Sequence, residues 1–155
     1  MKTQELNIET KNTQVANQLN ALLANYQIFY QNLRGLHWNV KGQFFFGLHA
    51  KYEELYNEAA EVIDELAERI LMVGGTPLHT FNDYTQHASL VAVENISEGK
   101  AGLEAVLQNS RYLLGQFREI LDVASENDDE GTVALMSDLI GSTEKRIWML
   151  NATLS

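Results

Sequence analysis

Cysteine is absent from the 155 residues, and proline occurs once, at Pro77. The lack of cysteine excludes disulfides and thiolate metal sites, and it is compatible with a reducing cytoplasm, where we expect the protein to reside. No apolar run approaches the roughly 18 residues of a membrane-spanning helix. The first residues, MKTQELNIETKNTQ, lack the apolar segment of a secretory signal. We therefore expect neither a membrane protein nor a secreted one.

Positive charge is also scarce, with 11 Lys and Arg against 21 Asp and Glu, so the formal net charge is −10. This balance argues against a general attraction to nucleic acid or anionic lipid and is compatible with cations as ligands. Up to residue 20, two lysines are offset by two glutamates, and Ser155 is not preceded by a basic extension. Direct DNA binding is therefore not expected, because phosphate neutralisation supplies most non-specific affinity.

Apolar residues recur at steps of three and four in four segments, and no segment alternates with period two. The segments are 15–33, 48–70, 103–121 and 133–150. This pattern predicts an all-α protein in which four amphipathic helices of roughly 20 to 30 residues form a four-helix bundle. The length suits one domain over residues 1–155, and we expect residues 1–10 to be a flexible N-terminal arm.

The predicted connections between the four helices differ in length. A short turn near Lys41-Gly42 joins the first two, and the acidic stretch SENDDEGT, residues 125–132, joins the last two. The second and third are separated by a long link over residues 74–97, in which TFNDYTQHASL could form a short extra helix. A long crossover lets the second and third helices run in the same direction, which is the ferritin-like arrangement.

Two of the four histidines bracket the first turn, in the stretch LHWNVKGQFFFGLH. His37 continues the apolar stripe of the first helix, where a lone histidine is more often a core residue than a ligand. On the second helix, four side chains that can bind metals lie away from the apolar stripe when each residue is given 100° of rotation: His49, Glu53, Asp64 and Glu68. The alternative is a solvated helix face, with Glu65 and Arg69 paired at i,i+4.

The spacing between these candidates excludes a metal site within one straight helix. His49 and Asp64 are 15 residues apart, or about 22 Å at 1.5 Å per residue. A second copy of the chain solves this problem if the two second helices pack antiparallel, with the two-fold axis near Tyr56 and Asn57. His37 and His49 of one subunit would then face Asp64 and Glu68 of the other. The Glu-x-x-His motif of single-chain di-iron bundles is absent.

At these residues the chain resembles the Dps family, the DNA-binding proteins from starved cells or miniferritins. The resemblance covers nearly the whole chain and is most specific in LHWNVKGQFFFGLHAKYEELY, DELAERILMVGGTP and EKRIWML. The family pattern is a histidine, a second one twelve residues on, an aspartate fifteen after that and a glutamate four further. Here the pattern falls on His37, His49, Asp64 and Glu68 without insertion or deletion.

The resemblance implies a ferroxidase that protects against oxidative damage. Its site would lie between two-fold-related subunits of a hollow dodecamer, oxidise Fe(II) with hydrogen peroxide in preference to dioxygen, and store Fe(III) as mineral. It implies two iron positions per site, the first served by His37, Asp64 and the bridging Glu68, the second by His49. Imidazole and carboxylate ligands suit iron, and few ligands leave room for an oxidant.

Two further residues, Glu53 and Trp38, are expected to lie next to the site. Glu53 stands where relatives often carry aspartate, and its longer side chain changes the reach and rotamer entropy at the second iron position. Trp38 would lie beside the site, where relatives use it to intercept oxidising equivalents, although packing at a subunit contact is an equal alternative.

The acidic connection occupies the place where relatives have a three-fold pore. Its carboxylates would draw cations inward if repeated around an axis, and they are Glu126, Asp128, Asp129 and Glu130. A solvated turn with aspartates near a helix N-terminus is the alternative for each residue singly. Asp122 and Asp138 are pore candidates of lower rank, and His87 is expected to be structural.

The competing function is a nucleoid-compacting DNA binder with little ferroxidase activity, and the third possibility is a metal-free helical scaffold.

Overall fold

The computed structural model describes residues 2–155, with side chains from Thr13 onward. Four long helices and one short helix follow in the order α1 (Lys2–Asn39), α2 (Phe45–Met72), α3 (Phe81–His87), α4 (Gly99–Glu126) and α5 (Glu130–Leu154). The described residues contain no strand. The all-α prediction and the short helix in the link are confirmed. The predicted flexible N-terminal arm covers residues 1–10, whose side chains lie outside the described part of the chain, so it stays a prediction.

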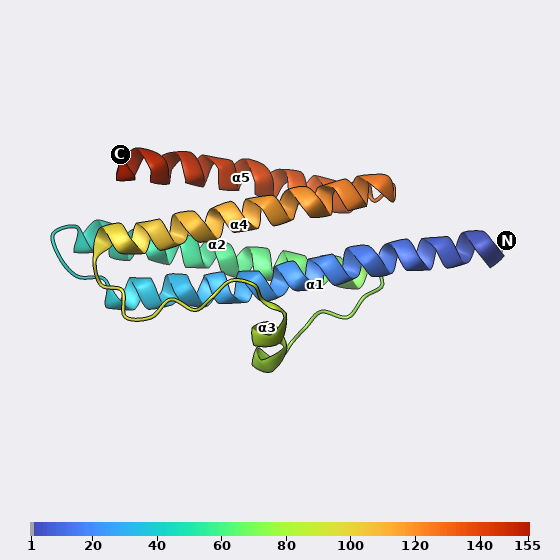
Figure 1. Cartoon of the computed structure of the whole chain (residues 1–155), viewed down its shortest axis with the longest axis horizontal. Helices are drawn as coiled ribbons and strands as arrows, with labels where there is room; N and C mark the ends of the chain where they lie inside the picture. Colours follow the sequence, from blue (N-terminus) through green and yellow to red (C-terminus); the bar gives the residue numbers. More distant parts are fainter. Residues whose placement is uncertain (1) are drawn as a thin grey trace.

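The bundle consists of two helical hairpins, α1 with α2 and α4 with α5, packed against each other mainly through α1 and α4. Figure 1 shows that the link between α2 and α4 returns along the length of the bundle, so that both helices run in the same direction. The ferritin-like crossover is thereby confirmed. The core is built from the predicted apolar stripes, and its largest fully buried side chains include Phe29, Tyr52, Leu66, Phe117 and Met136.

Three asparagines of α1 hold the crossover link against the bundle. Asn20 accepts from the Leu78 N–H and donates to the Thr76 carbonyl. Asn32 does the same further along, accepting from Val93 at 2.9 Å and donating to Val91 at 3.1 Å. Asn25 accepts from two consecutive link N–H groups, those of Ser89 and Leu90. The amide side chains therefore satisfy backbone groups that the link, without regular structure here, cannot pair within itself.

Three further hydrogen bonds fix the ends of the helices that carry the candidate site. The Lys41 N–H donates to the Ser97 carbonyl at 2.9 Å, which joins the α1–α2 turn to the end of the link. At the opposite end of the bundle, the guanidinium of Arg69 on α2 donates to Asp129 and Thr132 at the α4–α5 turn. Helix α2 is thus anchored near both ends.

Candidate metal centre

The turn between α1 and α2 brings His37 and His49 together. Gly42 adopts a φ of +109° in this turn, a conformation that side chains with a Cβ rarely adopt. The imidazole rings stack with their centroids 3.7 Å apart and their planes inclined by 16°. His37 is 7% exposed, and the His49 side chain is half-buried. The two histidines that bracket the turn in sequence therefore form one pair in space.

Each histidine is held by the other residue's backbone. His37 Nδ1 lies 2.7 Å from the His49 carbonyl oxygen, and His49 Nδ1 lies 2.8 Å from the His37 carbonyl oxygen. A carbonyl oxygen can only accept, so both Nδ1 atoms must carry the proton that they donate. In the neutral rings, each Nε2 then keeps its lone pair. Metal-binding histidines commonly donate their other ring nitrogen to a carbonyl in this way, which fixes the tautomer and orientation.

Aromatic rings enclose the histidine pair on two sides. Phe45 stacks on His49 with centroids 5.0 Å apart, and the Tyr56 ring meets His37 edge-on at 5.3 Å. The Tyr56 hydroxyl donates to Glu53 Oε1 at 3.2 Å. Burial, followed by the hydrogen bond to Glu53, raises the pKa of the Tyr56 phenol above its ordinary value. The phenol is therefore protonated at neutral pH.

The two carboxylates predicted to complete the site point away from the bundle core. Asp64 and Glu68 lie on α2 and are exposed, as is Glu53. Among the described residues, no three His, Asp or Glu side chains gather closely enough to hold one metal ion. A single chain thus presents a histidine pair at one end of α2 and a carboxylate pair further along, and their union across two subunits stays a prediction.

Trp38 follows His37 directly in the sequence, and its side chain contacts Arg34. Its side chain is 57% exposed, and the Arg34 guanidinium lies 4.8 Å from the centre of its ring. The same guanidinium also covers the ring of Tyr30. Within the part of the chain that the structure describes, the rings in contact with the histidines are those of Phe45 and Tyr56.

Sequence reasoning placed Tyr56 only near the proposed two-fold axis and missed its contact with His37. The signal was present in the helical spacing. Tyr56 follows His49 by seven residues and Glu53 by three, and both steps return to the same face of a helix.

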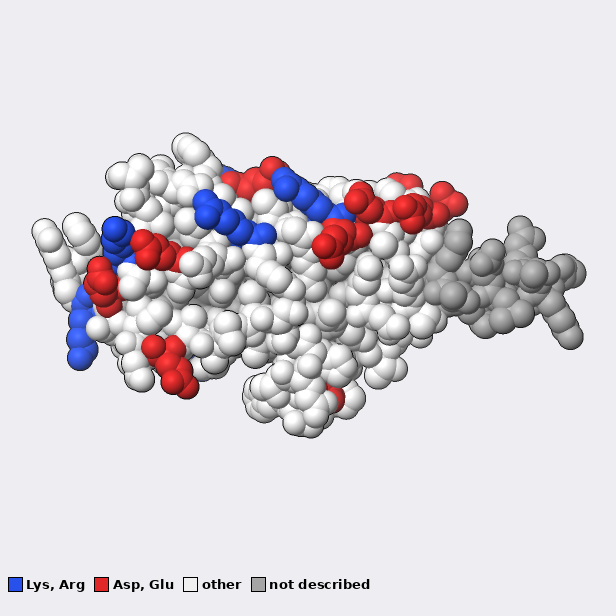
Figure 2. Space-filling view, viewed as in Figure 1, with Lys and Arg blue, Asp and Glu red and all other residues white. Residues whose placement is uncertain are grey.

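At the acidic turn between α4 and α5, one carboxylate is hydrogen-bonded within the protein and three are exposed. Asp129 caps α5, accepting from the backbone N–H and the hydroxyl of Thr132, and lies 2.6 Å from Arg69. Arg69 therefore pairs with Asp129, and the i,i+4 pair with Glu65 considered for a solvated face is wrong. The exposed residues are Glu126, Asp128 and Glu130, and a pore role for these three and for Asp129 stays a prediction. Figure 2 shows acidic side chains gathered over this end of the bundle.

The other titratable candidates lie apart from the histidine pair. Asp122 and Asp138 are exposed on α4 and α5. His87 Nδ1 lies 2.9 Å from the Asp83 carbonyl of its own helix, and His79 Nδ1 lies 3.0 Å from the Pro77 carbonyl. Both contacts are local, so these histidines help to order the link.

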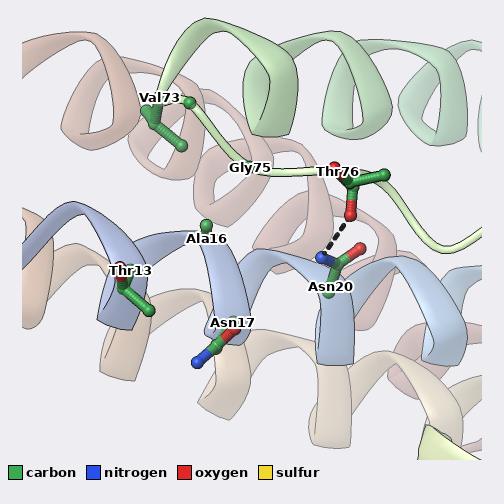
Figure 3. Close-up of a pocket in the computed structure, with 8 residues that line it drawn as sticks. Thr13, Ala16, Asn17, Asn20, Val73, Gly75 and Thr76 are labelled. Atoms are coloured by element: carbon green, nitrogen blue, oxygen red, sulfur yellow. Dashed lines mark hydrogen bonds between the residues drawn. The ribbon is translucent and has the colours of Figure 1, made fainter. Parts of the chain in front are cut away.

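A hollow of about 530 Å³ lies where the start of the described part of α1 meets the residues that follow α2. Figure 3 shows Asn20 reaching from α1 to the Thr76 carbonyl across this hollow. Its lining consists of Thr13, Ala16, Asn17, Asn20, Val73, Gly74, Gly75 and Thr76. Because the described lining contains no histidine, carboxylate or other titratable side chain, it offers no acid–base groups and none of the ligand types predicted for the iron site.

The arrangement of the helices is that of a ferritin-like protein, and a ferritin-like domain model matches residues 16–155. The DNA protection during starvation protein 2 of Bacillus anthracis is 37% identical over 144 residues, covering 93% of this chain and 99% of that protein. The crystal structure of the DPS protein from Vibrio cholerae O1, described as a ferritin-like diiron-carboxylate protein, matches with a TM-score of 0.94 at 48% identity. That match covers 95% of this chain and 92% of the Vibrio chain.

A Dps protein from Bacillus brevis is also similar, with a TM-score of 0.92 at 38% identity over 94% of this chain and 98% of that one. The chain belongs to the Dps family. None of the described helices combines the length and the apolar character that a membrane crossing requires.

Proposed function

We propose that the protein oxidises Fe(II), preferentially with hydrogen peroxide, at sites shared between two subunits, and retains Fe(III) as mineral inside a dodecameric shell. The observation that carries the proposal is the reciprocal bonding of His37 and His49 to each other's carbonyls. It leaves two oriented Nε2 atoms as ligands. The ferritin-like fold and the diiron-carboxylate description of the Vibrio relative support iron as the metal.

The second subunit supplies the carboxylates in this proposal. Asp64 and Glu68 are one turn apart on the exposed face of α2, so both can reach one ion that approaches this face. When α2 packs antiparallel against its copy, the carboxylates of one subunit face the histidines of the other, about 22 Å from the second, equivalent site. Glu68 would bridge two irons, Asp64 and His37 would complete the first position, and His49 with Glu53 would serve the second.

Ligand substitutions test the chemistry. His37→Ala and Asp64→Ala should each abolish rapid peroxide consumption with Fe(II), because each removes a ligand of the first iron position. Glu65→Gln is the matched control, since Glu65 is exposed on the same helix and adjacent to Asp64. Stopped-flow measurement of peroxide loss provides the readout. Unchanged kinetics in both alanine variants would reject the assignment.

Subunit mixing tests the sharing of the site. A chain without both histidines and a chain without both carboxylates should each be inactive alone. In randomly mixed dimers, about a quarter of the sites would combine intact histidines with intact carboxylates, so activity should return. A site built within one chain predicts no recovery. Native mass spectrometry of the unmixed protein should find a species near twelve subunits that gains mass on iron loading.

The competing function is DNA compaction, which the printed name of the Bacillus anthracis relative suggests. The net charge of −10 opposes it, because the chain would have to approach a dense array of phosphates. A gel shift at low salt between pH 5 and pH 8 separates the two functions. Retardation by the iron-free protein would favour DNA binding, and its absence would favour iron storage, which we propose takes place in the cytoplasm.

A further inference from the structure

The Tyr56 ring, which lies against the histidine pair, points to a source of electrons at the site other than Fe(II). Tyr56 meets His37 at 5.3 Å between ring centres, and its hydroxyl donates to Glu53. A phenol gives up an electron most readily when its proton can leave at the same time. The Glu53 carboxylate provides an acceptor for that proton at hydrogen-bonding distance, 3.2 Å.

The geometry favours Tyr56 over Trp38 for this role. Trp38 adjoins His37 in sequence, but its ring lies against the Arg34 guanidinium, 4.8 Å from the ring centre. A cation over an aromatic face is attracted by the ring electrons and therefore disfavours their loss. Tyr56 is half-buried and contacts the histidine ring itself.

We propose that Tyr56 donates one electron when only one Fe(II) is bound at the site and peroxide arrives. This inference rests on the proposed ferroxidase function. Two Fe(II) ions supply the two electrons that reduce peroxide to the level of water. A single Fe(II) supplies one, and the unmatched step would release a hydroxyl radical. Oxidation of Tyr56 would provide the missing electron within the protein.

One Fe(II) and the Tyr56 phenol each give one electron to one hydrogen peroxide, and the O–O bond breaks. The phenolic O–H bond breaks as well, and its proton passes through Glu53 to one of the oxygens. The products are one Fe(III), one neutral tyrosyl radical, one water and one hydroxide. Tyr56 thus becomes a sacrificial donor whose use prevents release of a hydroxyl radical.

Freeze-quench electron paramagnetic resonance tests this role. The assembled protein receives one Fe(II) per site, then one equivalent of peroxide without oxygen, with a spin trap in parallel samples. Wild type should show a tyrosyl signal and little trapped hydroxyl radical. Tyr56→Phe should lose that signal and trap more hydroxyl radical. Tyr112→Phe, which alters an exposed tyrosine on α4, should match wild type in both measurements.

Several results would overturn the proposal. A tyrosyl signal of wild-type size in Tyr56→Phe would do so, as would a signal that Trp38→Phe removes and Tyr56→Phe keeps. The proposal would also be overturned if the wild-type protein oxidised Fe(II) without any tyrosyl signal. In that case the ferroxidase function would be unaffected. Failure of the wild type to consume peroxide with Fe(II) would reject the ferroxidase itself. Peptide mass spectrometry after repeated turnover gives an independent check, since Tyr56 should gain oxygen before Tyr112.

Discussion

The Arg69 guanidinium lies 2.6 Å from the Asp129 carboxylate and joins the last turn of α2 to the N-cap of α5. The two residues are 60 positions apart in sequence, and both side chains are largely shielded from solvent. The contact fixes the carboxylate-bearing end of α2 against the acidic turn. It therefore holds Glu68, the residue before Arg69, at a defined place on the surface.

Replacing Asp129 should destabilise the protein through two losses. Asp129→Ala removes both the α5 cap and the partner of a partly buried arginine, so we expect a loss of about 1–3 kcal/mol in the free energy of unfolding. Asp128→Asn is the matched control. Asp128 is exposed with a φ of +57°, a conformation that asparagine tolerates. Denaturant unfolding measures both variants, and equal stability would contradict the role of Asp129.

The same contact predicts a dependence of stability on acid pH. Burial raises the pKa of Asp129, but the hydrogen bonds from Thr132 and the charge of Arg69 outweigh it and hold the pKa below its ordinary value. A depressed carboxyl pKa contributes stability above the unfolded-state pKa, about 3.9. That contribution is lost as pH falls through the folded-state pKa. Asp129→Asn should therefore flatten the fall of stability below about pH 4.

Asn32 should contribute to stability through the link that it holds. Its side chain is 5% exposed, and Asn32→Ala would leave the Val93 N–H and the Val91 carbonyl without their partner. We expect a loss of about 1–3 kcal/mol and faster hydrogen exchange confined to the link. Asn17→Ala is the control, because Asn17 is exposed on the same helix. Uniformly faster exchange over the whole chain would contradict a local role.

Two glycines of α4 should respond oppositely to alanine. A Cβ at Gly102 would collide with the Tyr52 hydroxyl and press on Leu36, whereas a Cβ at Gly115 meets nothing within 4 Å. We expect Gly102→Ala to cost about 1–3 kcal/mol through overpacking. Gly115→Ala should add about 0.5–1 kcal/mol, because alanine loses less backbone entropy in a helix. Thermal unfolding of both variants tests this contrast. A change in stability of the same sign in both variants would refute it.

Tyr52 should make stability fall at alkaline pH. Burial raises the pKa of its phenol to about 12, so the unfolded chain loses this proton at lower pH than the folded one. The contribution of Tyr52 is thus complete below about pH 10 and is lost as pH rises toward the folded-state pKa. Tyr52→Phe should flatten this decline, and Tyr112→Phe should leave it. Parallel alkaline unfolding curves for wild type and Tyr52→Phe would count against the prediction.

The sequence by itself determined the helices, their order and the crossover. Apolar steps of three and four specify one buried face per helix, and Gly74-Gly75 before Pro77 marks the end of α2. The spacing of His49 and Asp64 also showed that one straight helix cannot join them, since the rise per residue is fixed. These properties depend on local geometry alone.

Only the tertiary structure decided which polar groups meet. His37 and His49 bond to each other's carbonyls, and Tyr56 contacts His37. Arg69 pairs with Asp129 rather than with Glu65. Each of these contacts joins residues from separate elements of the fold. Periodicity assigns a residue to a face but leaves its partner open. Partners are set by how far each helix shifts and rotates against its neighbour, and a displacement of about one ångström is enough to break a hydrogen bond.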